Sequence, residues 1–147
     1  VYSPFGRNFV KTMLKLSAER DVVSVVSDQY GNPTSALDLA DGILHVANTL
    51  ASKPSVSNFG IFHIAGSGDA SWADVAQEVM EGCRERGHPF AQVKHIGSSE
   101  YPTKARRPLD SRLDCSKLQH CYGWTAPHWQ KSLAAIVEEL LDNDALR

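Results

Sequence analysis

The stretch VVSVVSDQYGNPT, residues 22–34, decides the fold expected for this chain, because an apolar run there ends in a turn that feeds a helical pattern. Asn32 precedes Pro33 and is therefore pushed out of the α region, while Gly31 can adopt a positive φ. A strand that ends in a structured turn before a helix is where α/β proteins place their ligand contacts. The turn at residues 28–34 is therefore predicted to have a fixed shape and to lie at a binding site.

Helical and strand-like patterns alternate along the rest of the chain. Apolar residues at helical spacing predict helices over residues 8–20, 35–51, 71–86, 114–122 and 127–142. Short apolar runs predict strands over residues 22–26, 60–65 and 92–96. Residues 97–113 lack periodicity and are expected to form a long loop, which in a compact domain is usually functional. Strands that alternate with helices indicate an α/β fold with short, mainly parallel strands.

Capping residues support the predicted helix starts. Asn8 is a candidate N-cap for the first helix, and Ser35 with Asp38 has the spacing of a capping box. Ser71 with Asp74 repeats this spacing before another helix. The apolar residues of the helix at 35–51 form one stripe, whose members are Leu37, Ala40, Ile43, Leu44, Ala47 and Leu50.

Composition and charge exclude several functional classes. With 147 residues, 42% hydrophobic content and 22% charged residues, the chain is typical of an ordinary globular protein. Its net charge of −2 offers no electrostatic footprint for nucleic acid, and no apolar run approaches the roughly 20 residues that span a bilayer. The three cysteines lack CxxC spacing and the six histidines lack metal-site pairing, so no metal is predicted. A cytoplasmic protein without nucleic-acid or membrane partners is expected.

Two features imitate cofactor chemistry without satisfying it. The segment at residues 66–71, GSGDAS, resembles the start of a dinucleotide fingerprint, but Ser71 replaces the third glycine and Asp69 would repel a pyrophosphate. A structural turn between strand and helix is the preferred interpretation. Tyr101 and Lys104 place a phenol near an ammonium, but a pair three residues apart in a loop lacks the helical spacing that such a proton donor needs.

Two polar clusters are better candidates for ligand contacts. Lys104, Arg106 and Arg107 place cations in the long loop of a slightly acidic chain, and the planar fork of arginine suits a phosphate. Surface salt bridges are the alternative role for these side chains. The amides and phenol of the turn at residues 28–34 can bind a nucleobase or sugar hydroxyls, or they can satisfy the turn's own backbone. Residue types alone do not choose between these roles.

Three segments then carry a resemblance to a known family. They are VYSPFGRNFVKTM at residues 1–13, DQYGNPT with the following DLA at residues 28–40, and ARRPLDSRL at residues 105–113. In this order they closely resemble the C-terminal half of the dTDP-4-dehydrorhamnose reductases, which belong to the extended short-chain dehydrogenase/reductases. Members of this family reduce the keto sugar of dTDP-4-dehydro-L-rhamnose with NADPH or NADH to give dTDP-L-rhamnose.

The resemblance implies that the reacting groups lie outside this chain. The family's glycine-rich cofactor turn and its Ser/Thr, Tyr-x-x-x-Lys set precede the point that matches Val1, so no catalytic residue is assigned here. Without the tyrosine that donates a proton and the nicotinamide that donates hydride, the carbonyl has neither partner. This chain alone is therefore expected to be inactive and unable to bind the NADPH or NADH that the parent protein uses.

The resemblance also implies a set of binding residues. The implied substrate contacts are Tyr2, Asn8, Gln29, Tyr30, Asn32, Arg106 and Arg107. Among them, Arg106 and Arg107 match a basic loop near the nucleotide diphosphate. Val1 matches the end of a core strand beside the nicotinamide and is the implied cofactor contact.

The expected domain organisation follows from the same resemblance. Residues 1–147 would form the substrate-binding half of the reductase, in which a strand and helix near residues 60–87 belong to the truncated cofactor domain. Apolar surface left uncovered by the truncation would favour self-association. Two alternatives stay open: another nucleotide-sugar reductase or epimerase, and a non-catalytic regulatory subunit of the same fold.

Overall fold

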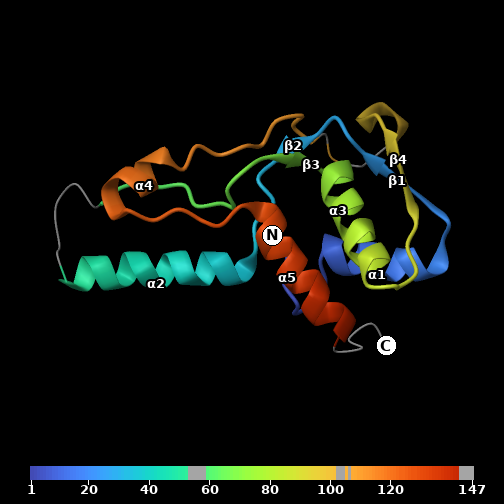
Figure 1. The fold of residues 1–147 in the computed structure, drawn as a ribbon. Helices are drawn as coiled ribbons and strands as arrows, with labels where there is room; N and C mark the ends of the chain where they lie inside the picture. The colour runs from blue at the N-terminus through green and yellow to red at the C-terminus, as the bar shows by residue number, and fades with distance from the viewer. Residues whose placement is uncertain (53–58, 102–104, 106, 143–147) are drawn as a thin grey trace.

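The computed structural model describes residues 1–52, 59–101, 105 and 107–142, and it confirms the α/β class (Figure 1). The predicted helices and two of the predicted strands are present. In chain order the elements are α1 (Phe9–Glu19), β1 (Val22–Val26), β2 (Tyr30–Gly31), α2 (Ala36–Ser52), β3 (Ala70–Ser71), α3 (Trp72–Glu85), β4 (Gln92–Ile96), the 3-10 helix η2 (Ser98–Glu100), α4 (Ser116–Tyr122) and α5 (Trp129–Asp142). Among these helices, none combines the length and apolar character that crossing a membrane requires.

The two small sheets have different directions. Strands β1 and β4 are parallel, with Val22 opposite Gln92 and Val26 opposite Ile96. Strands β2 and β3 form an antiparallel pair of two residues each. The parallel pair requires a crossover, and the chain between β1 and β4 supplies it through α2 and α3.

The hydrophobic core lies around α3, against which α1, α5 and the β1–β4 pair all pack. Its most buried side chains include Leu14 of α1, Val79 of α3 and Leu133 of α5. Helix α3 begins with the predicted capping box, in which Ser71 Oγ accepts from the Asp74 N–H and Asp74 accepts from the Ser71 N–H. This helix belongs to the 60–87 piece, and it packs within the core of this chain.

The strand predicted at residues 60–65 is wrong. Residues 61–66 have no regular secondary structure, although the sequence there is apolar. A strand needs a partner for its backbone groups, and no strand of the described part of the chain pairs with this segment. Ile61 is 82% exposed in consequence.

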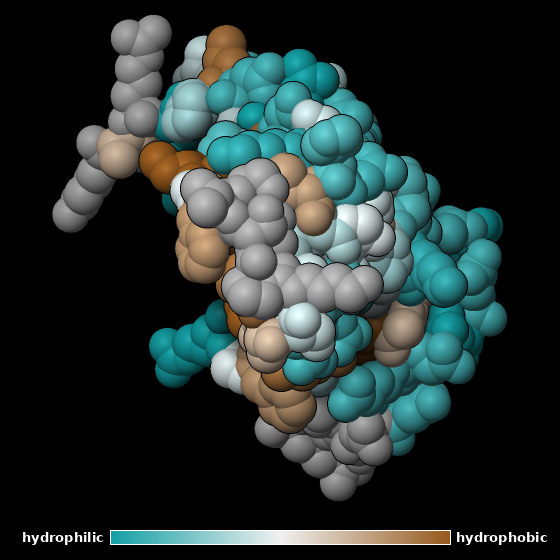
Figure 2. Space-filling view, turned by 90° about the vertical axis from the view of Figure 1, so that its left-hand side faces the viewer, coloured by the Kyte–Doolittle hydropathy of each residue, from teal (hydrophilic) through white to brown (hydrophobic). Residues whose placement is uncertain are grey.

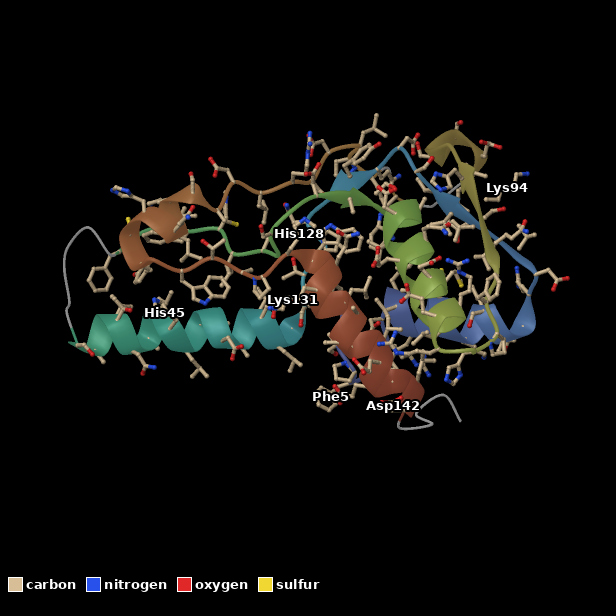
Figure 3. All side chains as sticks on the ribbon, viewed as in Figure 1. Phe5, His45, Lys94, His128, Lys131 and Asp142 are labelled. Atoms are coloured by element: carbon tan, nitrogen blue, oxygen red, sulfur yellow. The ribbon has the colours of Figure 1, made fainter. Side chains whose placement is uncertain are left out.

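Helix α2 lies outside the core, in an extension that we call the arm, consisting of α2, residues 59–66 and residues 114–128 (Figure 1). Within the arm, His45 on α2 contacts the Tyr122 carbonyl at 2.8 Å, on the side that Figure 3 shows facing α4. Gly42 lets α2 approach Trp124 and Ile64, since a Cβ there would lie 2.7 Å from Trp124 Cη2 and 2.6 Å from Ile64 Cδ1.

The apolar stripe of α2 faces solvent rather than the core. Leu37, Ile43 and Leu44 are 46%, 60% and 61% exposed, and Gly42 is the buried residue of this helix. Figure 2 looks at the outer end of the arm and shows hydrophobic side chains at the surface beside polar ones. The arm therefore carries an uncovered apolar face.

Candidate functional site

The turn at residues 28–34 lines a cavity of about 470 Å³, which we call the first cavity. The other walls come from Val1 and Tyr2, from the start of α1, from the start of α3 and from residues 107–113. Segments that are distant in sequence thus meet at the predicted turn. The turn thus lines a cavity, at the position between strand and helix where a binding site is predicted.

A second cavity of about 640 Å³ lies between α1 and β1. All residues of β1, Val22–Val26, line it. Phe9, Gln29, Trp72 and Arg107 line both cavities, which are therefore adjacent. An elongated ligand can occupy both at once.

An aromatic pair stands where the two cavities meet. The rings of Phe9 and Trp72 are 4.9 Å apart in an edge-to-face arrangement. From sequence, Phe9 is predicted only as an apolar residue of the first helix and Trp72 only as the residue after the capping Ser71. Neither is predicted as a site residue. The signal that could have marked Trp72 is a large aromatic residue directly after a capping serine, where a helix N-terminus opens toward a turn.

Tyr2 contributes its ring to the first cavity, but its hydroxyl points into the core. The hydroxyl donates to the Trp129 carbonyl at 2.9 Å, and the residue is only 4% exposed. Burial, and then the charge of Asp38, raise the pKa of Tyr2 well above its usual range. The phenol therefore stays protonated and serves to join the N-terminal segment to α5.

Replacing Tyr2 with phenylalanine is expected to lower the free energy of unfolding by about 1–2 kcal/mol, because the Trp129 carbonyl loses a buried donor. The ring that lines the first cavity stays in place, so ligand affinity should not change. Urea denaturation and calorimetric titration of the same variant check the two statements. Weaker ligand binding at unchanged stability would instead make the hydroxyl a ligand contact.

Asn8 caps α1, as predicted, and both ends of its amide are engaged near the cap. Its Oδ1 accepts from the Lys11 N–H at 3.1 Å and its Nδ2 donates to the Ser3 carbonyl at 2.8 Å. The cap fixes the start of α1, from which Phe9 and Val10 line the first cavity. The contribution of Asn8 that the structure shows is thus to hold a cavity wall.

The turn at residues 28–34 is held at both ends. At one end the Asp28 carboxylate accepts from the Ser98 N–H at 3.0 Å and from Ser98 Oγ at 2.9 Å, and the hydrogen bond from the N–H lowers the pKa of Asp28 most. At the other end Thr34 Oγ1 donates to the Asn32 carbonyl at 2.8 Å and accepts from the Gly66 N–H at 3.0 Å. These bonds account for the fixed shape.

The start of α2 is capped by Ser35, whose Oγ accepts from the Leu37 N–H at 3.1 Å. The Asp38 carboxylate accepts from Ser132 Oγ of α5 at 2.6 Å. The base of α2 is therefore fastened to α5, next to the turn.

Of the basic loop, Arg107 is exposed and lines both cavities. Arg106 and Lys104 lie outside the described residues. Tyr101 lines the second cavity and is 57% exposed. Gln29, Tyr30 and Val1, which are among the predicted contacts, line the first cavity, and Val1 is 78% exposed.

The glycine-rich segment after residue 65 has a structural reason for its glycines. A Cβ on Gly66 would lie 2.1 Å from the Pro33 carbonyl oxygen, and one on Gly68 would lie 2.4 Å from His128 Nε2. Figure 3 shows His128 at the start of α5, beside this segment. Close packing against Pro33 and His128 therefore accounts for both glycines, as expected for a structural turn between strand and helix. In the described part of the chain, no three His, Cys, Asp or Glu residues are grouped to hold a metal ion.

Comparison with known proteins gives concordant matches. A family model described as the RmlD substrate binding domain matches residues 1–142. The dTDP-4-dehydrorhamnose reductase of Sinorhizobium fredii is 44% identical over 141 residues, which are 96% of this chain and 48% of that protein. The reductase of Escherichia coli K12 is 38% identical over 148 residues, 99% of this chain and 49% of that protein.

A solved structure agrees with these sequence matches. The dTDP-4-dehydrorhamnose reductase of Bacillus anthracis, determined in complex with NADP, superposes with a TM-score of 0.79 at 30% identity. The superposition covers 94% of this chain and 45% of that chain. The chain spans about half the length of the curated relatives that it matches.

Proposed function

The chain belongs to the RmlD substrate binding domain family, and on that premise we propose that it is the substrate-binding half of an NADPH- or NADH-dependent reductase. The reaction is the reduction of dTDP-4-dehydro-L-rhamnose to dTDP-L-rhamnose in the cytoplasm. The observation that carries the proposal is the family match over residues 1–142. The matching relatives are named dTDP-4-dehydrorhamnose reductases, which is the reaction proposed here.

The two adjacent cavities support an elongated nucleotide-sugar ligand. Among the described strands β1 pairs only with β4, so its other edge has backbone N–H and C=O groups that can bind a nucleobase in the second cavity. The first cavity, with Gln29 and Tyr30 in its wall, would take the sugar. Arg107 lines both cavities and would meet the diphosphate that joins base and sugar.

The role of this chain in the reaction is to bind and orient the substrate. The nicotinamide supplies hydride when it is bound, and the glycines of the segment near Gly66 are explained by close packing against Pro33 and His128 rather than by a cofactor. The cofactor and the proton donor are therefore assigned to the rest of the parent protein. Val1, exposed at the edge of the first cavity, is the candidate contact with the nicotinamide.

Replacing Arg107 with alanine in the full-length reductase is expected to weaken dTDP binding by about tenfold to a hundredfold, because a charge-assisted hydrogen bond to phosphate is lost. The double variant Arg106→Ala/Arg107→Ala should lose at least as much dTDP affinity. Affinity for NADPH should change little. Calorimetric titration with dTDP and with NADPH measures both.

Arg84→Ala is the matched control for this experiment, since Arg84 is an exposed arginine that pairs with Glu81 on α3. Unchanged dTDP affinity in the Arg107 variants would contradict the assigned site. Turnover of UDP-sugars in place of dTDP-4-dehydro-L-rhamnose by the full-length protein would instead favour a different nucleotide-sugar enzyme.

We also propose that the arm contacts the half of the parent protein that lies outside this chain. The apolar face of α2 and the side chains of Phe59 and Ile61 are uncovered here, whereas α3 packs into the core. The piece near residues 60–87 that is assigned to the cofactor domain would then end at about residue 66, and α3 would belong to the substrate-binding half. An uncovered apolar face of this kind also favours self-association of the chain alone.

A further inference from the structure

Three loops line the first cavity, and the side chain of Asn32 contacts the other two. Asn32 Oδ1 accepts from the Leu113 N–H at 2.7 Å, and Asn32 Nδ2 donates to the Gly68 carbonyl at 2.9 Å. The first partner belongs to the loop that carries Arg107, and the second belongs to the segment that leads into α3. The side chain of Asn32 therefore bonds the turn to both neighbouring walls, in addition to the β2–β3 pair and the backbone bonds of Tyr30.

The orientation of this amide is determined by its partners. A backbone N–H can only donate and a carbonyl can only accept, so Oδ1 must face Leu113 and Nδ2 must face Gly68. An aspartate at position 32 has the same size but no donor. It would keep the bond from Leu113 and place a carboxylate oxygen against the Gly68 carbonyl.

Arg112 joins the same two walls to each other. Its Nη1 donates to Asp69 Oδ2 at 3.1 Å, while Nε and Nη2 donate to the two carboxylate oxygens of Asp110 at 2.9 and 2.7 Å. These hydrogen bonds lower the pKa of Asp110 to about 2, so the ion pair persists at neutral pH. With the two bonds of Asn32, this guanidinium closes a ring of contacts around one side of the cavity.

The loop that carries Arg107 is also bonded to the turn through backbone groups. The Tyr30 N–H donates to the Leu109 carbonyl at 2.8 Å, and the Ser111 N–H donates to the Tyr30 carbonyl at 2.9 Å. Pro108 restricts Arg107 to extended backbone. Arg107 therefore lies two residues before Leu109, the first residue of this loop that bonds the backbone of the turn.

We propose that Asn32 and Arg112 are positioning residues, which hold the three loops of the first cavity in the arrangement that places Arg107 against the diphosphate of a nucleotide sugar. This inference rests on the proposed function. It assigns to Asn32 a role that acts through other residues, in place of direct contact with the substrate.

The test compares Asn32→Asp and Arg112→Lys in the full-length reductase. Asn32→Asp should weaken dTDP binding and raise the KM for the dTDP-sugar by about tenfold, since one part-buried hydrogen bond is replaced by repulsion. Arg112→Lys should weaken dTDP binding by about threefold to tenfold, because a single ammonium cannot bond both carboxylates as the fork does. The kcat and the KM for NADPH should stay within about twofold of the parent values.

Matched controls are Asn48→Asp on the exposed face of α2 and Arg84→Lys on α3, which should leave dTDP affinity unchanged. A lower Tm with unchanged dTDP affinity and KM would show a purely structural role and overturn the inference. If Asn32→Asp fails to fold, Arg112→Lys decides alone, because its ion pairs are about half exposed. Absence of dTDP binding to the unmodified reductase would overturn the proposed function itself.

Discussion

Replacing Gly66 with alanine is expected to lower the free energy of unfolding by about 3 kcal/mol or more. The added Cβ would lie 2.1 Å from the Pro33 carbonyl oxygen and 3.2 Å from the Pro33 carbonyl carbon. Both are backbone atoms of the turn, which cannot move away as the end of a flexible side chain can. Relief of the clash would displace either the turn or the segment that leads into α3.

The displacement would also break a local hydrogen bond, since the Gly66 N–H donates to Thr34 Oγ1 at 3.0 Å. Thr34 in turn accepts at its carbonyl from the Tyr2 N–H at 2.9 Å. Loss of this junction would disturb three walls of the first cavity together. We therefore expect the Gly66 variant to lose dTDP affinity in addition to stability.

Chemical denaturation followed by circular dichroism measures the stability change, and Gly97→Ala is the matched control. The nearest atom to a Cβ on Gly97 is Ser99 Oγ at 3.5 Å, an ordinary contact, so this variant should change stability by less than about 1 kcal/mol. A Gly66 variant as stable as the Gly97 variant would contradict the close approach that the structure shows.

The shape of the turn could be predicted from sequence only in part, and its partners could not. Gly31 does not have a positive φ; it lies in β2, where a Cβ would meet Ser111 Oγ at 2.9 Å. Pro33 limits the residue before it, and these local effects act within a few residues. The side chain of Asn32 instead bonds residues 36 and 81 positions away. Nothing in the local pattern shows whether an amide meets such a distant backbone group or a ligand, so the sequence could name Asn32 as important without identifying its role.

The missing strand at residues 60–65 and the exposed stripe of the helix at 35–51 have a common physical cause. Apolar periodicity indicates that a segment has a face to bury, but it does not identify what covers that face. Leu44 lies on a predicted apolar stripe and is 61% exposed. Ile61 lies in a predicted strand that has no partner among the described strands. Both are correctly identified as apolar, and the described residues leave both side chains exposed.

Two leucines test whether the rest of the parent protein covers the arm. Leu133 of α5 is fully buried in the core, so Leu133→Ala should cost about 2–5 kcal/mol of unfolding free energy in this chain and in the full-length reductase alike. Leu44 is exposed, so Leu44→Ala should cost less than about 0.5 kcal/mol in this chain. In the full-length reductase, where we expect the stripe to be covered, it should cost about 2 kcal/mol or more.

The same leucine tests self-association of the chain alone. An apolar stripe on an isolated helix face favours contact between copies, so light scattering of the chain should show a mass above that of the monomer, and Leu44→Glu should reduce it. Glutamate fits an exposed helix position and should not disturb the core, where Leu133 lies. A monomer at all concentrations would mean that water covers the stripe in the chain alone. A cost for Leu44→Ala that is equally small in the full-length reductase would mean that water covers the stripe there as well. The arm would then be a solvent-exposed extension, of which Ile64 and Ala65 still line the first cavity.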